Sequence, residues 1–156
     1  GKNDFGIVID GINNTLIRFA KCCTPLPGDE IGGFVTKLTG ITVHRHNCSN
    51  FKAMVEKDPS REISVKWDDN LLETKANRYN FSFNIVARDR QSLLMDIINL
   101  IANHKINVTS LNSSEMKNNG EKLVKVRISI EIKSRTEYDY LLNNILKIKD
   151  VISVER

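Results

Sequence analysis

The sequence predicts an α+β protein in which a small, strand-rich module is followed by a module of alternating strands and helices. Short apolar runs separated by Pro, Gly and Asn fill residues 5–68, which is typical of strands joined by turns. From residue 79 onward, apolar residues recur in turn at period 2 and at spacings of three and four, which indicates strands alternating with amphipathic helices. We therefore expect domains at 1–68 and 79–156, with a connector at 69–78.

The first module contains five predicted strands and one short helix. Pro, Gly and Asn bound the strands, because these residues suit the backbone angles of turns. Ser49 or Asn50 is expected to cap the helix. The pair Gly32 and Gly33 predicts a β-bulge rather than a nucleotide loop. The predicted strands are Phe5 to Ile9, Thr15 to Ala20, Ile31 to Lys37, Ile41 to His46 and Ile63 to Trp67, and the helix is Ser49 to Lys57.

The second module follows the order β-α-β-β-α-β, the ferredoxin-like arrangement, in which two helices cover one face of an antiparallel sheet. Asp89 is expected to cap the first helix, and residues 118–120 (Asn-Asn-Gly) predict a hairpin turn. The strands begin near Tyr79, Ile106, Leu123 and Val151, and the two helical faces are Leu93, Leu94, Ile97, Ile98 and Ile101, then Tyr138, Leu141, Leu142 and Ile145.

The first module carries a cluster of metal-ligating residue types, Cys22, Cys23, His44 and Cys48, which includes all three cysteines of the chain. Its pattern is C-C-x20-H-x3-C. Zinc takes four sulfur or nitrogen ligands at tetrahedral corners. Three thiolates and one imidazole would complete such a site and would join the segment around Cys22 to the segment around His44.

Other interpretations of these residues stay open. Adjacent cysteines can be small buried hydrophobic residues, and a cysteine beside His44 can form a nucleophile and base pair. Three cysteines leave one odd thiol, which argues against a disulfide framework. His46 lies two residues after His44, so in a strand both would point to the same face. The thin core expected of so small a module favours a metal.

Composition limits the function classes. Hydrophobic residues make up 40% and charged residues 27% of the chain, as in ordinary globular proteins. The sequence has no apolar run of 18 residues and no signal peptide, which favours the cytoplasm and predicts no membrane partner. The net charge of +4 suits a phosphate-rich partner without showing a basic arm. No P-loop or catalytic set is present, and the start at Gly1 without Met suggests a piece of a longer protein.

Two motifs now resemble one family. Residues 19–31 resemble the F-A-x-C-C-x-P-x-P-G-D-x-I stretch of the long RelA/SpoT-homologue proteins. Residues 40–48 resemble the G-x-x-V-H-R-x-x-C segment that follows it there. The β-α-β-β-α-β unit resembles the ACT domain that ends those proteins, with Asp89 and Arg90 in its first loop and Asn107 in its second strand.

The resemblance implies a regulatory fragment that is not itself an enzyme. The parent would be a (p)ppGpp synthetase, hydrolase or both, acting as a GTP diphosphokinase through domains outside this fragment. The first module would be the zinc-finger-like or RIS domain and the second the ACT domain. In the family this part docks on ribosomal RNA near uncharged tRNA during the stringent response, contacts the catalytic domains and, in some members, binds branched-chain amino acids.

Two expected sites carry over from the resemblance, and a third is expected from basic residues that lie near the metal ligands in the sequence. The zinc ligands would be Cys22, Cys23, His44 and Cys48, with His46 spare. Basic residues expected near the metal and available to phosphates are Lys21, Lys37, Arg45 and Lys52. An amino acid at the ACT domain would contact Asp89, Ser92, Leu93 and Asn107.

One departure from the family concerns the amino-acid site. Ligand-binding ACT domains usually have Gly where this chain has Ser92, and we expect its Cβ to crowd a ligand and to oppose a positive φ. The exposed edge of a four-stranded sheet also suggests a homodimer through the ACT domain. Val108 and Leu111 are the residues expected at that contact.

Overall fold

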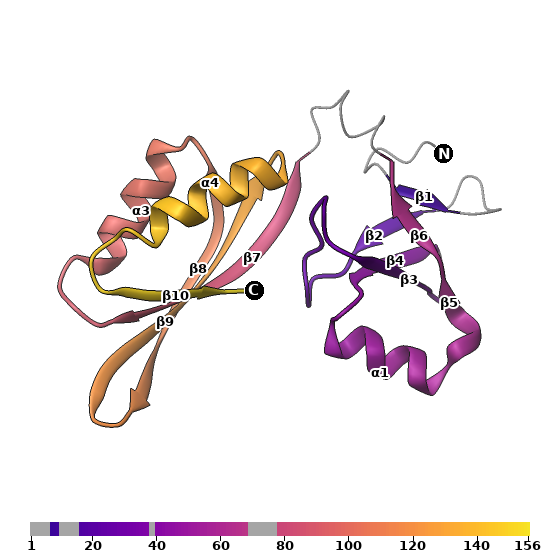
Figure 1. Cartoon of the computed structure of the whole chain (residues 1–156), viewed down its shortest axis with the longest axis horizontal. Coiled ribbons are helices and arrows are strands. Elements are labelled where there is room, and N and C mark those ends of the chain that lie inside the picture. The colour runs from indigo at the N-terminus through magenta and orange to yellow at the C-terminus, as the bar shows by residue number, and fades with distance from the viewer. Residues whose placement is uncertain (1–6, 10–15, 38–39, 69–77) are drawn as a thin grey trace. The chain divides into compact units, whose positions relative to one another are not determined.

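The structure is a computed structural model that describes residues 7–9, 16–37, 40–68 and 78–156. The chain forms two compact units, residues 1–77 and 78–156, each described here by itself (Figure 1). Apart from Arg78, the predicted connector at 69–78 lies outside the described residues, as do the first two residues of the first predicted strand.

The described residues of the first unit form two small sheets and one α-helix. Strand β1 (Ile7–Ile9) pairs antiparallel with β6 (Val65–Trp67). The second sheet has the order β2-β4-β3-β5, with β2 and β4 parallel and the other pairs antiparallel. Its strands are β2 (Ile17–Phe19), β3 (Ile31–Val35), β4 (Ile41–Arg45) and β5 (Glu62–Ile63), and α1 (Ser49–Lys57) and a 3-10 turn, η1 (Pro59–Arg61), lie between β4 and β5.

The predicted strand from Ile63 to Trp67 is two strands in two different sheets. Strand β5 ends at Ile63, Ser64 separates the two, and β6 begins at Val65. Ile63 and Trp67 nevertheless pack against one buried cluster that includes Val65. The alternation therefore predicted correctly which side chains face the core. It could not show the change of partner, because period 2 reports the buried face and not the neighbouring strand.

The expected bulge at Gly32 and Gly33 is wrong, because both glycines keep regular pairing with β4. Close packing explains them instead. A Cβ on Gly32 would lie 2.4 Å from Cζ of Phe51, and one on Gly33 would lie 2.8 Å from Cγ2 of Ile63. Glycine thus lets the helix α1 approach β3 closely through Phe51, which is 2% exposed.

The helix α1 has the predicted bounds but a different N-cap. The N-cap residue is Cys48, whose backbone is extended, and neither Ser49 nor Asn50 holds that position. The reason lies in the preceding turn, where the Cys48 N–H donates to the carbonyl of Arg45 at the end of β4. The cap is therefore set by how the chain leaves β4.

The second unit confirms the predicted β-α-β-β-α-β order. Its sheet has the order β10-β7-β9-β8, and all neighbouring strands are antiparallel. Both helices cover the same face of this sheet (Figure 1). The elements are β7 (Tyr79–Arg88), α3 (Leu93–Asn103), β8 (Asn107–Asn118), β9 (Glu121–Ile132), α4 (Arg135–Ile145) and β10 (Val151–Glu155).

Aromatic and β-branched residues fill the space between the sheet and the helices. Phe81 and Phe83 are fully buried, and Tyr138 of α4 meets the Phe81 ring edge-on with 4.4 Å between centroids. Leu93, Ile97 and Ile101 form the buried face of α3, whereas Ile98, expected on the same face, is 38% exposed. Ile98 lies one position beyond Ile97, so a helix that buries Ile97 fully turns Ile98 toward solvent.

The β8–β9 hairpin has the predicted turn. Asn119 and Gly120 have φ angles of 49° and 81°, as a type I′ turn requires. Strand β8 lies at the edge of the sheet, where a homodimer contact was expected. Val108 and Leu111, the residues expected at that contact, are half-buried and pair with the fully buried Ile130 and Ile128 of β9.

We predict that Gly32→Ala destabilises the first unit by about 1–3 kcal/mol, because the new methyl group overlaps the Phe51 ring. Urea denaturation followed by the fluorescence of Trp67, the single tryptophan of the chain, reports on this unit alone. The control is the pair of variants carrying Phe51→Leu, with and without Gly32→Ala. The smaller side chain relieves the overlap, so the two losses should sum to more than the loss in the double variant. Strictly additive losses would contradict the close approach.

Candidate metal centre and candidate ligand pocket

Three separate segments bring the predicted metal ligands to one point. Cys22 and Cys23 lie in the turn after β2, His44 lies near the end of β4, and Cys48 is the N-cap of α1. The parallel pairing of β2 with β4 places the turn that holds Cys22 and Cys23 beside His44. The Ala20 N–H continues this pairing beyond β2 by donating to the carbonyl of Val43. The four ligand atoms all lie within 4.8 Å of one another.

Three of the six distances among these atoms match the edges of a tetrahedral site. The Cys22 Sγ lies 3.7 Å from the Cys48 Sγ and 3.5 Å from the His44 Nδ1, and the Cys23 Sγ lies 3.8 Å from the same nitrogen. Zinc bonds of about 2.3 Å to sulfur and 2.1 Å to nitrogen give tetrahedral edges of about 3.8 Å and 3.6 Å. All three cysteines are free thiols, so the residues form a metal-binding group without a disulfide.

Burial and local hydrogen bonds set the protonation of the group. Burial raises the pKa of Cys23 to about 12. The backbone N–H of Arg45, which donates to the Cys23 Sγ at 3.2 Å, acts to lower this pKa. Burial lowers the pKa of His44, so its ring is neutral. Burial also acts to raise the pKa of Cys48, but the backbone N–H groups at the start of α1 and the Cys22 thiol bring it below its usual value.

These directions suit a dication. Without a metal, the Cys23 thiol keeps its proton and the His44 imidazole can accept a metal through a lone pair. The Nδ1 atom faces the sulfurs, whereas Nε2 is buried and has no hydrogen-bond partner among the residues the structure describes. The polar contacts of the ring therefore all lie on the cluster side, and a bound cation would offset the burial of the Cys23 and Cys48 thiolates.

His46 does not belong to the metal-binding group. Strand β4 ends at Arg45, so the expectation that His44 and His46 share a strand face is wrong. The His46 backbone N–H donates to the carbonyl of Glu30, and the side chain is exposed. His44 and His46 both lie near the Phe51 ring, with centroids 5.4 and 6.0 Å away, but only His44 is buried.

The four predicted basic residues do not form one group. Lys21 precedes Cys22 and is exposed, and Lys52 is exposed on the first turn of α1, where its N–H donates to the Cys48 carbonyl. Arg45 is half-buried, and its Nε donates to the carbonyl of Cys23, so it braces the cluster.

Lys37 does not lie near the metal-binding group, contrary to expectation. Ile31 pairs with Arg45 beside the cluster, and β3 then runs away from it to Val35, two residues before Lys37. Lys37 instead lines a separate cleft with Lys57 and Arg61.

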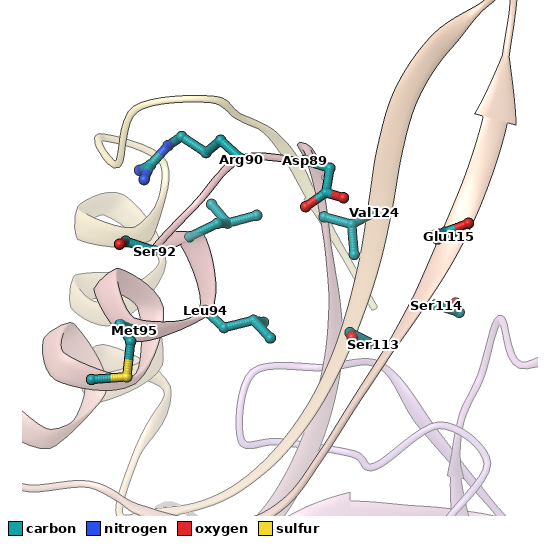
Figure 2. A pocket seen from close by; sticks show the side chains of 10 residues that line it. Asp89, Arg90, Ser92, Leu94, Met95, Ser113, Ser114, Glu115 and Val124 are labelled. Atoms are coloured by element: carbon teal, nitrogen blue, oxygen red, sulfur yellow. The ribbon is translucent and has the colours of Figure 1, made fainter.

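The second unit has a pocket of about 480 Å³ where β7 leads into α3. Asp89, Ser92 and Leu93, three of the residues expected to bind an amino acid, line it. Figure 2 shows the side chain of Asp89 beside Val124, with Leu94 on the helix side. Ser113, Ser114 and Glu115 of β8 and Val124 of β9 complete the wall.

The backbone at Ser92 adopts the geometry that we expected a side chain to oppose. Ser92 is the N-cap of α3 and has φ 69° and ψ 5°, in the left-handed region. The expectation that Ser92 resists a positive φ is therefore wrong, although the conformation costs about 1–2 kcal/mol for a residue with a Cβ. Asp89, expected to cap α3, instead continues from β7, where its N–H donates to the carbonyl of Lys122.

Arg90 holds this loop in place. Its Nη2 lies 2.8 Å from Asp96 Oδ2 and its Nε lies 3.0 Å from Asp150 Oδ2, and Nη2 also donates to the carbonyl of Lys149. These contacts tie the entry of α3 to the turn before β10. The loop that carries Ser92 is therefore held in place by the contacts of Arg90.

Asn107 lies outside the pocket, contrary to its expected role. It is at the start of β8 and donates to Glu131, whereas the pocket meets β8 at Ser113 and beyond. Six residues of strand place these positions about 20 Å apart. The sequence did not indicate Ser113, Ser114 and Glu115, because only the β8–β9 register brings them to the start of α3.

The comparisons with known proteins agree with this architecture. Residues 7–68 match the RelA/SpoT RIS domain, and residues 75–156 match the ACT domain. The chain is 32% identical over 155 residues to the GTP pyrophosphokinase of Haemophilus influenzae and 33% identical over 156 residues to that of Escherichia coli. It is 31% identical over 154 residues to the bifunctional (p)ppGpp synthase/hydrolase RelA of Mycobacterium tuberculosis. Each match covers 99% of this chain and 20% of the relative.

The fold and the site define a two-domain class of protein, in which a module with a Cys/His cluster that could hold a metal precedes an ACT domain. The chain belongs to the RelA/SpoT-homologue family, of which it carries the RIS and ACT domains. It spans about a fifth of the length of the curated relatives it matches. Within the described residues, no helix is both long enough and apolar enough to cross a membrane.

We predict that the reduced chain binds one Zn²⁺ and that His44→Ala weakens this binding by more than the roughly 10- to 100-fold typical of a lost supporting residue. His46→Ala is the matched control, because it removes an imidazole two residues away that is not a ligand. Its affinity should stay within about twofold of the unsubstituted chain. Competition with a chromophoric chelator at fixed pH measures both constants, since protons compete for the thiolates. Equal losses in the two variants would show that the group is assigned wrongly.

Proposed function

We propose that this chain is the regulatory RIS–ACT part of a longer (p)ppGpp synthetase, hydrolase or both, acting in the stringent response. It controls pyrophosphate transfer from ATP to GTP or GDP by docking on the ribosome beside uncharged tRNA and by contacts with the catalytic domains of the parent. One observation carries the proposal: the two domains match in this order over nearly the whole chain, and the relatives bear names of that activity. The setting is the cytoplasm.

The metal in this proposal is zinc, with a structural role. The group has three sulfurs and one nitrogen, the ligand set of closed zinc sites. A Cys–His nucleophile is less well supported, because two further thiols surround the His44 imidazole and burial holds the pKa of Cys23 at about 12. Zinc would fix the turn after β2 against β4 and α1, and so would set the surface that these segments present.

The proposed RNA contact lies on this surface. Lys21 and Lys52 flank the metal-binding group, and both side chains are exposed. Ammonium groups on a metal-fixed turn and on the first turn of a helix can meet phosphates without a large ordering cost. Arg45 supports this surface because its Nε donates a hydrogen bond to the Cys23 carbonyl.

We predict that Lys21→Glu combined with Lys52→Glu weakens binding of the chain to ribosomes that carry uncharged tRNA. Each lost phosphate contact should reduce the slope of log affinity against log salt by about 0.7–0.9. Lys147→Glu combined with Lys149→Glu, at two exposed lysines of the second unit, is the control of equal charge change and should leave the slope unchanged. Co-sedimentation at several salt concentrations measures the slopes. If both variants lose affinity alike, net charge rather than this surface governs binding.

A second candidate function is amino-acid sensing by the ACT domain. Two observations favour it: the pocket beside α3 is large enough for a small amino acid, and Ser92 keeps the left-handed backbone that opens the loop. Asp89 and Glu115 offer carboxylates for an ammonium group, and Leu93, Leu94 and Val124 offer apolar surface. A branched-chain amino acid has both features. A homodimer through the exposed backbone of β8 would place a second chain beside this pocket.

We predict saturable binding of valine, isoleucine or leucine at one per chain, with tighter binding in Ser92→Gly, because removal of the Cβ clears the approach to the loop backbone. Calorimetric titration measures both. Lys105→Gly is the matched control, since Lys105 also has a positive φ of 58° and lies at the other end of α3. Both variants should gain up to about 1 kcal/mol of stability, but only Ser92→Gly should change affinity. No heat with any of the three amino acids would leave docking as the function.

A further inference from the structure

We infer that Cys22 and Cys48 are a thiol pair that peroxide converts to a disulfide, while Cys23 stays reduced. The inference goes beyond the proposed function, since neither RNA docking nor amino-acid binding requires it. Its basis is the unequal placement of three thiols that share one cluster.

Exposure selects the thiol that meets the oxidant. The Cys22 side chain is exposed, whereas Cys23 and Cys48 are 5% and 8% exposed. The Cys23 sulfur also accepts a hydrogen bond from the backbone N–H of Arg45 at 3.2 Å, and the Arg45 guanidinium donates a hydrogen bond to the Cys23 carbonyl. A small oxidant arriving from solvent therefore reaches Cys22 first.

Distance selects the second thiol. The Cys48 Sγ lies 3.7 Å from the Cys22 Sγ, on a different segment of the chain, so a small movement joins them. Cys23 is a poor partner for Cys22 because the Cα atoms of adjacent residues are about 3.8 Å apart, below the roughly 4.4–6.8 Å that disulfides span. Cys48 is thus the thiol placed to resolve an oxidised Cys22.

The reaction has two steps. In the first, the Cys22 sulfur attacks one peroxide oxygen, the O–O bond breaks, and a sulfenic acid forms as water leaves. In the second, the Cys48 sulfur attacks the Cys22 sulfur, an S–S bond forms, and the S–O bond breaks with release of a second water. The two thiols supply two protons and two electrons, and one peroxide is reduced to two waters.

The product cannot hold a tetrahedral metal. The disulfide would consume two of the four ligands and leave Cys23 and His44. Oxidation of the exposed thiol would therefore release the metal and replace it with a covalent link between the turn after β2 and the N-cap of α1. This second consequence rests on the proposed zinc, whereas the choice of cysteines does not.

The test treats the reduced, metal-free chain with one equivalent of hydrogen peroxide, blocks the remaining thiols by alkylation, and maps tryptic peptides by mass spectrometry. We expect the peptide beginning at Cys22 to be linked to the peptide that holds Cys48, with the alkyl group on Cys23. An alkyl group on Cys22 with Cys23 in the link would overturn the assignment, as would the absence of any link.

Two matched variants give a second measurement. Cys23→Ser should form the link in a yield within about twofold of the unsubstituted chain, and Cys22→Ser should lose it at least tenfold. The reverse order would overturn the inference. Zn²⁺-loaded chain under excess peroxide should release its metal in step with disulfide formation, which a colorimetric chelator follows. A link without metal release would refute the coupling, and RNA binding by the reduced chain, measured separately, tests the proposed function independently.

Discussion

The first module depends on the meeting of Cys22, Cys23, His44 and Cys48 at one point. These residues come from a turn, a strand and the start of a helix, and their ligand atoms all lie within 4.8 Å of one another. Within the described residues, the two buried clusters of this module contain five buried residues each. Few apolar contacts are therefore available to fix these three segments to one another, and a metal bound to all of them would do so directly.

The packing of Phe51 against Gly32 makes this meeting possible. Because Gly32 has no Cβ, α1 can lie close to β3, and Cys48 at its N-cap reaches the end of β4. The Arg45 side chain and backbone then hold Cys23. Metal ligands and close packing thus act on the same few residues, so damage to either should weaken the other.

The ACT domain depends on a different constraint, the long antiparallel pairing of β7 and β9, whose inner residues are fully buried beneath two helices. This rigid layer leaves the loop between β7 and α3 to carry the pocket. Arg90 anchors the loop, and Ser92 takes the strained backbone angle. Strain held by a fastened loop beside a pocket is a common feature of binding sites.

The sequence by itself determined the α+β class, the order of elements in the second module, the bounds of α1 and the hairpin turn at Asn119 and Gly120, because local periodicity and turn chemistry decide these. The sequence also identified the four candidate metal ligands, through their pattern and through the family that the chain resembles. Only the tertiary structure decided which strands pair and that Ile63 and Val65 lie in different sheets. It also decided that the Phe51 ring packs against Gly32, and that Lys37 and Asn107 lie far from their expected sites. The physical reason is that strand register and the exit direction of each turn arise from contacts between distant segments, and residue spacing along the chain does not encode them.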